Sequence, residues 1–317
     1  MKTVVLYSGG LDSTLALDIV KGWGAEVYPL HINYKFLSTK SLPKIPGLKV
    51  IDLTKNLLKI IRNPKFGFGK NLNPCIDCRI MMLKKAKAYM KEVKADFIVT
   101  GEVLDQRPMS QRLDVMITIE REAGVEGMVV RPLSDGLLPP TIPLKKGLIK
   151  LEGMYKIRGR SRKFELYLAK KKNITDFFPP AGGCLLCDPG FSKRLADLMR
   201  HQEDISADDI ELLKVGRHFR LAPDTKLVVG RQEAENEILE ELQTSKMYLL
   251  YVPDTGSPNT LLLGDKKYLK TAAAVTARYS DKNKEPHVEV AYKHRGKIKK
   301  LLVSPIREEE LSQWRVA

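Results

Sequence analysis

The chain has 317 residues, a length that predicts more than one domain. Hydrophobic residues make up 43% of it, enough for buried cores, and no apolar run reaches the roughly 18 residues of a membrane span. The first residues resemble a bare strand and not a signal peptide, so we expect a cytoplasmic protein with no membrane partner. The net charge of +16, spread along the chain, predicts contact with a large polyanion, above all a nucleic acid.

The first half of the chain alternates short apolar segments with helical ones. We expect strands at residues 3–7, 26–33, 49–53 and 96–100, and helices at 13–21 and 79–93. Apolar strands separated by helices are typical of an α/β fold with a doubly wound parallel sheet. Ligands of such sheets bind at the carboxyl ends of the strands, so the loops there are the candidate site.

The segment Ser8-Gly9-Gly10-Leu11-Asp12-Ser13 follows the first expected strand and opens the first expected helix. Its glycines allow the backbone to approach a ligand closely, and a helix N-terminus offers free N–H groups to phosphate. Ser8 and Ser13 add hydroxyl donors, and Asp12 is placed to hold a Mg²⁺ that bridges phosphates. No Gly-Lys-Ser/Thr follows, so this is not a Walker motif.

The loop resembles the signature of the PP-loop ATP pyrophosphatases, which cleave ATP between the α and β phosphates and transfer AMP to a carbonyl-type oxygen. The resemblance implies that ATP and Mg²⁺ bind at Ser8, Gly9, Gly10, Asp12 and Ser13. It also implies that His31 and Asn33, at the end of the second strand, lie near adenine. Gly101, after the fourth strand, would lie near the ribose or the α-phosphate.

The four cysteines form two Cys-x-x-Cys pairs, Cys75 with Cys78 and Cys184 with Cys187. In a reducing cytoplasm such pairs indicate metal, cluster or sulfur chemistry before disulfides. Three interpretations remain open from the residues. They are a structural Zn²⁺ site, a thiolate or persulfide pair that passes sulfur, and an iron–sulfur cluster held by three cysteines with one iron left open.

Asn73-Pro74 followed by Cys78 resembles the tRNA thiouridine synthetases of the MnmA type, in which the reactive cysteine matches Cys78. The Cys-x-x-Cys with a distant cysteine is similar to cluster-dependent thiolases of the TtuA type and to cluster-bearing ThiI-like proteins. These resemblances cover residues 1–190. They imply a [4Fe-4S] cluster on Cys75, Cys78 and one of Cys184 or Cys187, with Zn²⁺ less favoured. Asp12, Cys78 and Cys187 are the candidate catalytic residues.

Two basic or polar segments of the first half are further candidates. Arg158, Arg160, Arg162 and Lys163 lie close together in the sequence, and they fit either a phosphate clamp for RNA or a solvated helix face. Residues 106–112 follow the fourth strand, a position that favours contacts with ATP or substrate over a bland loop.

The last third changes character. Residues 191–224 form an expected helical connector, and residues 225–317 an α+β domain smaller than the first, 1–190. Val229-Gly230-Arg231, a later Gly-Ser loop and an Ala-rich helix ending at Tyr279-Ser280 resemble the NFACT-R RNA-binding domain. Its candidate RNA contacts are Arg231, Lys297, Lys299 and Lys300. Tyr248, Tyr251, Tyr279 and Tyr292 fit either base stacking or core packing.

Together the resemblances imply a tRNA uridine sulfurtransferase that adenylates a uracil carbonyl oxygen and then inserts sulfur. Its partners would be tRNA and a sulfur donor, whether sulfide, a cysteine desulfurase or a carrier protein; a homodimer is left open. Two alternatives stand beside it. One is an adenylating enzyme that makes an amide or nitrile on a small molecule. The other is a non-enzymatic RNA-binding factor with a vestigial ATP site.

Overall fold

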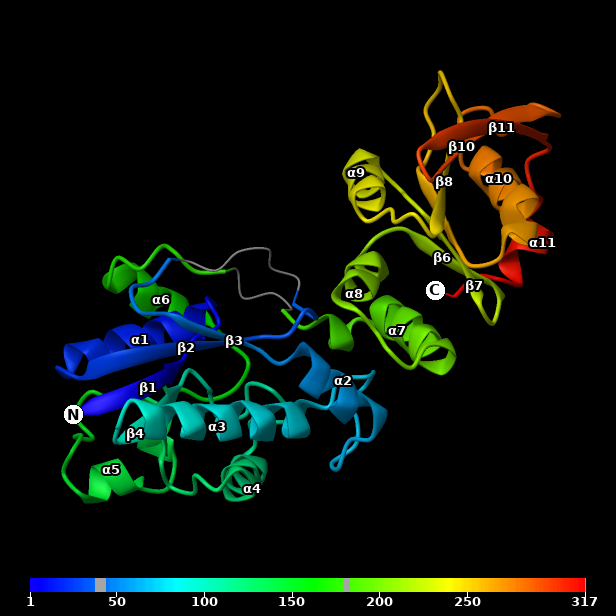
Figure 1. Ribbon diagram of the computed structural model, residues 1–317. Coiled ribbons are helices and arrows are strands. Elements are labelled where there is room, and N and C mark those ends of the chain that lie inside the picture. Colours follow the sequence, from blue (N-terminus) through cyan, green and yellow to red (C-terminus); the bar gives the residue numbers. More distant parts are fainter. Residues whose placement is uncertain (38–43, 179–182, 317) are drawn as a thin grey trace. The chain divides into compact units, whose positions relative to one another are not determined.

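The computed structural model describes residues 1–37, 44–178 and 183–316 (Figure 1). They divide into two compact units, Met1–Cys187 and Asp188–Ala317. Among the helices of the described residues, none combines the length and apolarity needed to cross a membrane.

The first unit is built on a five-stranded parallel sheet, which confirms the predicted fold class. The strand order is β3-β2-β1-β4-β5. The strands are β1 (Lys2–Leu6), β2 (Glu26–Asn33), β3 (Lys49–Asp52), β4 (Phe97–Thr100) and β5 (Val129–Val130). Chain order reverses direction between β1 and β4, and this is the place where doubly wound sheets bind ligands.

Helices cover both faces of this sheet. The helices are α1 (Leu11–Gly22), α2 (Thr54–Arg62), α3 (Cys75–Glu92), α4 (Leu113–Ala123), α5 (Ile142–Lys145) and α6 (Lys163–Lys171), with 3₁₀ turns η1 (Asp135–Leu137) and η2 (Leu185–Cys187). Helices α1 and α6 lie on one side, and α3 and α4 on the other (Figure 1). The core forms where Val5 and Val99 of the sheet meet Ala16 and Val20 of α1.

The second unit is an antiparallel six-stranded sheet of order β11-β10-β8-β9-β7-β6 with helices. Its strands are β6 (Arg217–Ala222), β7 (Thr225–Val229), β8 (Met247–Tyr251), β9 (Thr260–Leu263), β10 (Val288–His294) and β11 (Lys297–Val303). Its helices are α7 (Pro189–His201), α8 (Ala207–Lys214), α9 (Glu233–Glu241), α10 (Leu269–Arg278) and α11 (Glu308–Ser312), with the 3₁₀ turn η3 (Lys266–Tyr268).

The helical prediction for the connector is correct only in part. Helices α7 and α8 lie there, but residues 217–222 form strand β6, which pairs with β7. The two faces of β6 are both covered: His218 is buried on one side and Phe219 joins the core with α10 on the other. Burial on both faces removes the alternation that would have indicated a strand.

Candidate active site

The loop between β1 and α1 has the backbone expected of an anion-binding turn. Gly9 has φ +77°, in the left-handed region where glycine carries no steric penalty. Gly10, which precedes α1, has no side chain to cap the helix, so the N–H groups of the first turn remain directed outward. The Ser13 hydroxyl donates to the Gly10 carbonyl at 2.9 Å and lies 3.1 Å from the Ser8 hydroxyl. Both serine hydroxyls therefore also brace the loop.

Asp12 lies at the start of α1 with its carboxylate largely buried. One oxygen, Oδ2, is 3.3 Å from Nη1 of Arg162. The other, Oδ1, is buried without a hydrogen-bond partner among the described residues. Burial raises the pKa of Asp12, and the nearby Arg162 opposes that shift. A buried, unpartnered carboxylate oxygen on a phosphate-type loop fits a divalent cation.

Gly101 explains how close the sheet comes to this loop. A Cβ on Gly101 would lie 2.5 Å from the backbone carbonyl of Asp12. Only glycine allows the end of β4 to approach the first turn of α1 in this way. Its place is therefore directly beside the loop, at the sheet's change of direction.

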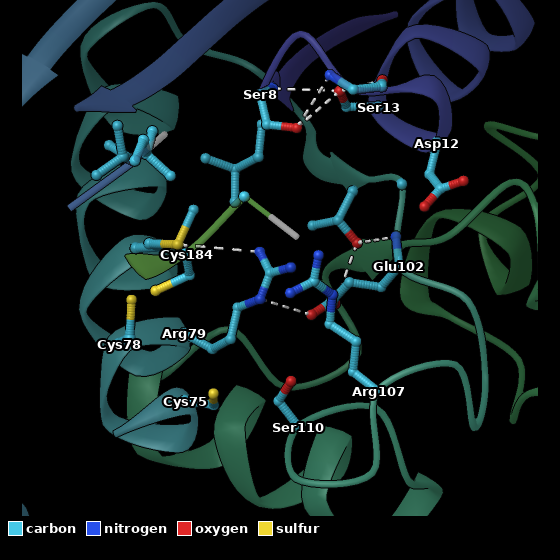
Figure 2. A pocket seen from close by; sticks show the side chains of 18 of the residues that line it. Ser8, Asp12, Ser13, Cys75, Cys78, Arg79, Glu102, Arg107, Ser110 and Cys184 are labelled. Atoms are coloured by element: carbon cyan, nitrogen blue, oxygen red, sulfur yellow. Dashed lines mark hydrogen bonds and ion pairs between the residues drawn. The ribbon is translucent and has the colours of Figure 1, made fainter. Parts of the chain in front are cut away.

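A cavity of about 230 Å³ opens at this edge of the sheet. It is lined by Gly10, Asp12 and Ser13 from the loop and by His31 and Gly101 from the strand ends. Three cysteines of the two pairs line the same cavity: Cys75, Cys78 and Cys184. Figure 2 shows these thiols and the Ser8–Ser13 loop around one space. The structure thus joins the phosphate-type loop to both Cys-x-x-Cys segments.

The thiols reach the cavity from two segments. Cys75 and Cys78 occupy the first turn of α3, and Cys184 itself forms an isolated antiparallel bridge with Leu37. Cys187, the most exposed of the four, is hydrogen-bonded through its side chain to Cys184 and Cys75. As the side chains lie, no group of three Cys, His, Asp or Glu residues in the described parts of the chain has the spacing of a metal site.

The thiols differ in acidity. Burial raises the pKa of Cys78 to about 11, and it also raises that of Cys75. The hydrogen bond with Cys184 lowers the pKa of Cys187 and raises that of Cys184. Cys187 is therefore the most readily ionised thiol of the set, and thiolates are the nucleophilic form of cysteine.

A row of paired charges from separate elements lies beside the cavity, and no local sequence pattern predicted it. Arg79 of α3 lines the cavity and pairs with Glu102 at 3.2 Å. Glu102 pairs with Arg131 at 3.0 Å, and Arg131 with Glu120 at 2.6 Å. Burial opposes the charge of Glu102, yet the two arginines hold its carboxyl pKa below the usual value.

The structure separates the other sequence candidates. His31 lines the cavity, with Nδ1 2.9 Å from the Tyr7 carbonyl, and burial lowers its pKa. Asn33 does not line it; its amide donates to Asp52 at 3.3 Å. Within the predicted segment 106–112, Gln106, Arg107, Ser110 and Gln111 line the cavity.

The basic segment before α6 divides in the same way. Arg162 lines the cavity beside Asp12, so its side chain lies where we expect ATP to bind. Arg158, Arg160 and Lys163 are exposed, and Arg158 pairs with Asp105 at 2.7 Å.

In the second unit the candidate RNA contacts lie on its surface. Arg231 is engaged in an ion pair with Glu235 one turn along the chain. Lys297, Lys299 and Lys300 are exposed on β11, and Lys300 pairs with Glu289 at 2.7 Å. Three of the four tyrosines proposed for stacking, Tyr248, Tyr279 and Tyr292, pack against the core instead.

Comparison with known proteins supports this two-part organisation. Residues 1–136 match the family model described as thiamine biosynthesis protein (ThiI). Residues 216–315 match the model of the NFACT protein RNA binding domain. The resemblances to ThiI-like proteins and to the NFACT-R domain are thereby confirmed. The match within the second unit includes β6, which the sequence had assigned to the connector.

Two curated relatives match part of the chain. A probable tRNA sulfurtransferase of Thermococcus kodakarensis is 30% identical over 146 residues, which are 42% of this chain and 36% of the relative. A probable tRNA sulfurtransferase of Alkaliphilus metalliredigens is 28% identical over 141 residues, 42% of this chain and 35% of the relative. The chain spans about a third of the length of these relatives. A crystal structure of a 4-thiouridine synthetase–RNA complex with bound ATP shows 27% identity, covers 42% of this chain and 37% of its own, and has a TM-score of 0.36.

Proposed function

We propose that this chain thiolates a uridine of tRNA at the expense of ATP. The observation that carries the proposal is the single cavity that joins the Ser8–Ser13 loop to three of the four cysteines. The likeness to two probable tRNA sulfurtransferases supports it, as do the ThiI model matched by residues 1–136 and the RNA binding domain matched by residues 216–315.

The first step is adenylation. The N–H groups at the start of α1 bind the phosphates of ATP, and Asp12 would hold Mg²⁺ through its unpartnered oxygen, which neutralises the departing pyrophosphate. A uracil carbonyl oxygen attacks the α-phosphorus, and the α–β phosphate bond breaks. Arg162 and Arg107 add positive charge where negative charge develops.

The second step replaces oxygen by sulfur. A nucleophilic sulfur attacks the activated ring carbon, and AMP leaves with the former carbonyl oxygen. Cys78, which lines the cavity, is the residue we place next to that carbon, and Cys187, hydrogen-bonded to Cys184 and Cys75, is the candidate second thiol. A persulfide on Cys78, formed with sulfur from a cysteine desulfurase, would attack through its outer sulfur. A second cysteine thiol of the set would then attack the Cys78 sulfur and break the S–S bond, which frees the thiouridine and leaves a disulfide for an external thiol to reduce.

The donor set also fits an iron–sulfur cluster by its chemistry, because three thiols from two segments line the same cavity and the fourth, Cys187, is hydrogen-bonded to two of them. Cys75, Cys78 and one of Cys184 or Cys187 would hold it, with Zn²⁺ as the competing metal. A [4Fe-4S] cluster with one open iron would supply a binding place for sulfide.

The test is anaerobic turnover of the full chain with tRNA, ATP and Mg²⁺, with either sulfide or a cysteine desulfurase, cysteine and a reducing thiol as the sulfur source, read as thiouridine by nucleoside mass spectrometry. Cys78→Ser should abolish thiouridine but keep tRNA-dependent exchange of pyrophosphate into ATP, because adenylation precedes sulfur transfer. If exchange proceeds without any RNA and thiouridine never forms, adenylation of a small molecule replaces this proposal.

A further inference from the structure

The outer face of α6 exposes large apolar side chains. Phe164, Leu166 and Tyr167 are 46%, 44% and 57% exposed, whereas Leu168 and Ala169 of the same helix pack in the core with α1. A surface helix normally turns polar residues to water. Three large apolar side chains exposed on one helix form a patch of the kind that marks a binding surface.

The aromatic rings of this patch are held in place by the fold. The ring of Tyr155 is 5.9 Å from that of Phe164, at 65°, and the ring of Phe164 is 6.0 Å from that of Tyr167, at 35°. Tyr155 is half-buried against the core between α1 and α6. The exposed rings therefore sit beside an anchored one, and Tyr167 offers more than half of its surface to solvent.

Positive charge surrounds the rings. Five exposed cations lie in or next to α6 in the sequence, and within the described residues none of the five has an ion pair: Lys156, Arg160, Lys163, Lys170 and Lys171. The acidic residue inside α6, Glu165, is buried. Exposed rings among uncompensated cations complement unpaired nucleotides, whose bases stack and whose phosphates are negative. A protein partner would need an acidic surface that also carries apolar anchors. Unpaired nucleotides combine both features in every residue, so we favour RNA as the occupant.

The patch is also fixed relative to the cavity. Arg162, which lines the cavity beside Asp12, directly precedes α6. The segment before Arg162 is hydrogen-bonded to the loop after β4, since the Gly159 N–H donates to the Leu104 carbonyl at 2.7 Å. An RNA strand lying on α6 would therefore meet the cavity through Arg162.

We propose that the outer face of α6, with Tyr155, is a stacking platform for unpaired nucleotides of the RNA whose uridine enters the cavity. This inference rests on the proposed function, because that function is what brings a uridine of the RNA into the cavity. The platform itself lies outside residues 1–136, so it is a feature of this chain beyond the matched family segment. Tyr167 and Phe164 stack on bases, and the lysines of α6 hold phosphates.

The test measures binding of the full chain to a fluorescent single-stranded oligoribonucleotide and to tRNA, without ATP. Tyr167→Ala should weaken oligoribonucleotide binding about tenfold, the loss expected for one stacked base. Tyr167→Phe should restore it, because the ring face remains. Leu166→Ala is the matched control, with similar exposure on the same helix but no ring, and it should bind as the wild type does.

A second measurement avoids substitutions. Oligoribonucleotides carrying 5-iodouridine, irradiated on the wild-type chain, should crosslink to a peptide containing Tyr167 or Phe164. Equal binding by Tyr167→Ala and wild type, with crosslinks confined to other peptides, would overturn the platform even if thiouridine forms. Weak binding by Tyr167→Ala in a chain that never makes thiouridine would uphold the platform and remove the proposed function.

Discussion

The cavity of the first unit and the β10–β11 hairpin of the second use charge in opposite ways. At the cavity, the buried carboxylate of Glu102 pairs with Arg79 at 3.2 Å and with Arg131 at 3.0 Å. On the hairpin, Lys297 and Lys299 stand exposed. Buried pairs fix geometry and are little screened by salt, whereas exposed charges attract a polyanion from a distance and weaken as salt rises. The comparison suggests that reaction and RNA capture rest on different electrostatics.

The largest effect should follow from a change at Asp12, whose Oδ1 has no hydrogen-bond partner among the described residues. Asp12→Asn removes the negative oxygen that we assign to Mg²⁺, so pyrophosphate exchange should fall on the order of 10²–10³-fold. Asp18→Asn is the control, because Asp18 lies on the same helix in an exposed pair with Lys172 at 2.6 Å. Full exchange by Asp12→Asn would mean that the buried charge of the cavity does not serve ATP.

The second effect tests whether the buried pairs hold the cavity together. Glu102→Gln leaves Arg79 and Arg131 without their shared carboxylate, and loss of a buried partner costs about 3–5 kcal/mol. Urea unfolding followed by Trp23 fluorescence in a Trp314→Phe background reports on the first unit, since the chain has two tryptophans. Glu122→Gln, which removes an exposed partner of Lys65, should leave the midpoint unchanged. Similar midpoints for both variants would contradict the contrast.

The second unit holds a buried lysine that blurs the contrast. Lys226 of β7 is 6% exposed, and burial lowers its pKa to about 8. The unfolded chain keeps the proton up to pH 10.5, so it binds more protons than the folded unit between these values. Stability should therefore rise by roughly 3 kcal/mol as pH increases from 8 to 10.5. Lys226→Met should remove that rise, measured by Trp314 fluorescence in a Trp23→Phe background.

How much of the site the sequence could reveal depends on how local its signal is. The loop around Asp12 is contiguous, and the cysteine pairs need only their spacing, so both were predictable. Glu102 and its arginines belong to separate elements and meet only through tertiary packing. His31 and Asn33 are two apart on one strand, yet Asn33 ends β2 and bonds to Asp52 of the neighbouring strand. Whether the Asn33 side chain reaches the cavity depends on the neighbouring strand β3, so the sequence of β2 alone does not predict it.

The smallest effect concerns the exposed hairpin and compares adjacent lysines. Lys300 is already neutralised by Glu289 at 2.7 Å, whereas Lys299 has no ion pair within the described residues. Lys299→Gln should lower the slope of log Kd for tRNA against log salt by about 0.7–0.9, one released counterion's worth, and Lys300→Gln by less. Fluorescence anisotropy over a salt series measures both slopes. Parallel lines for wild type and Lys299→Gln would place RNA capture elsewhere, with α6 of the first unit as the next surface to neutralise.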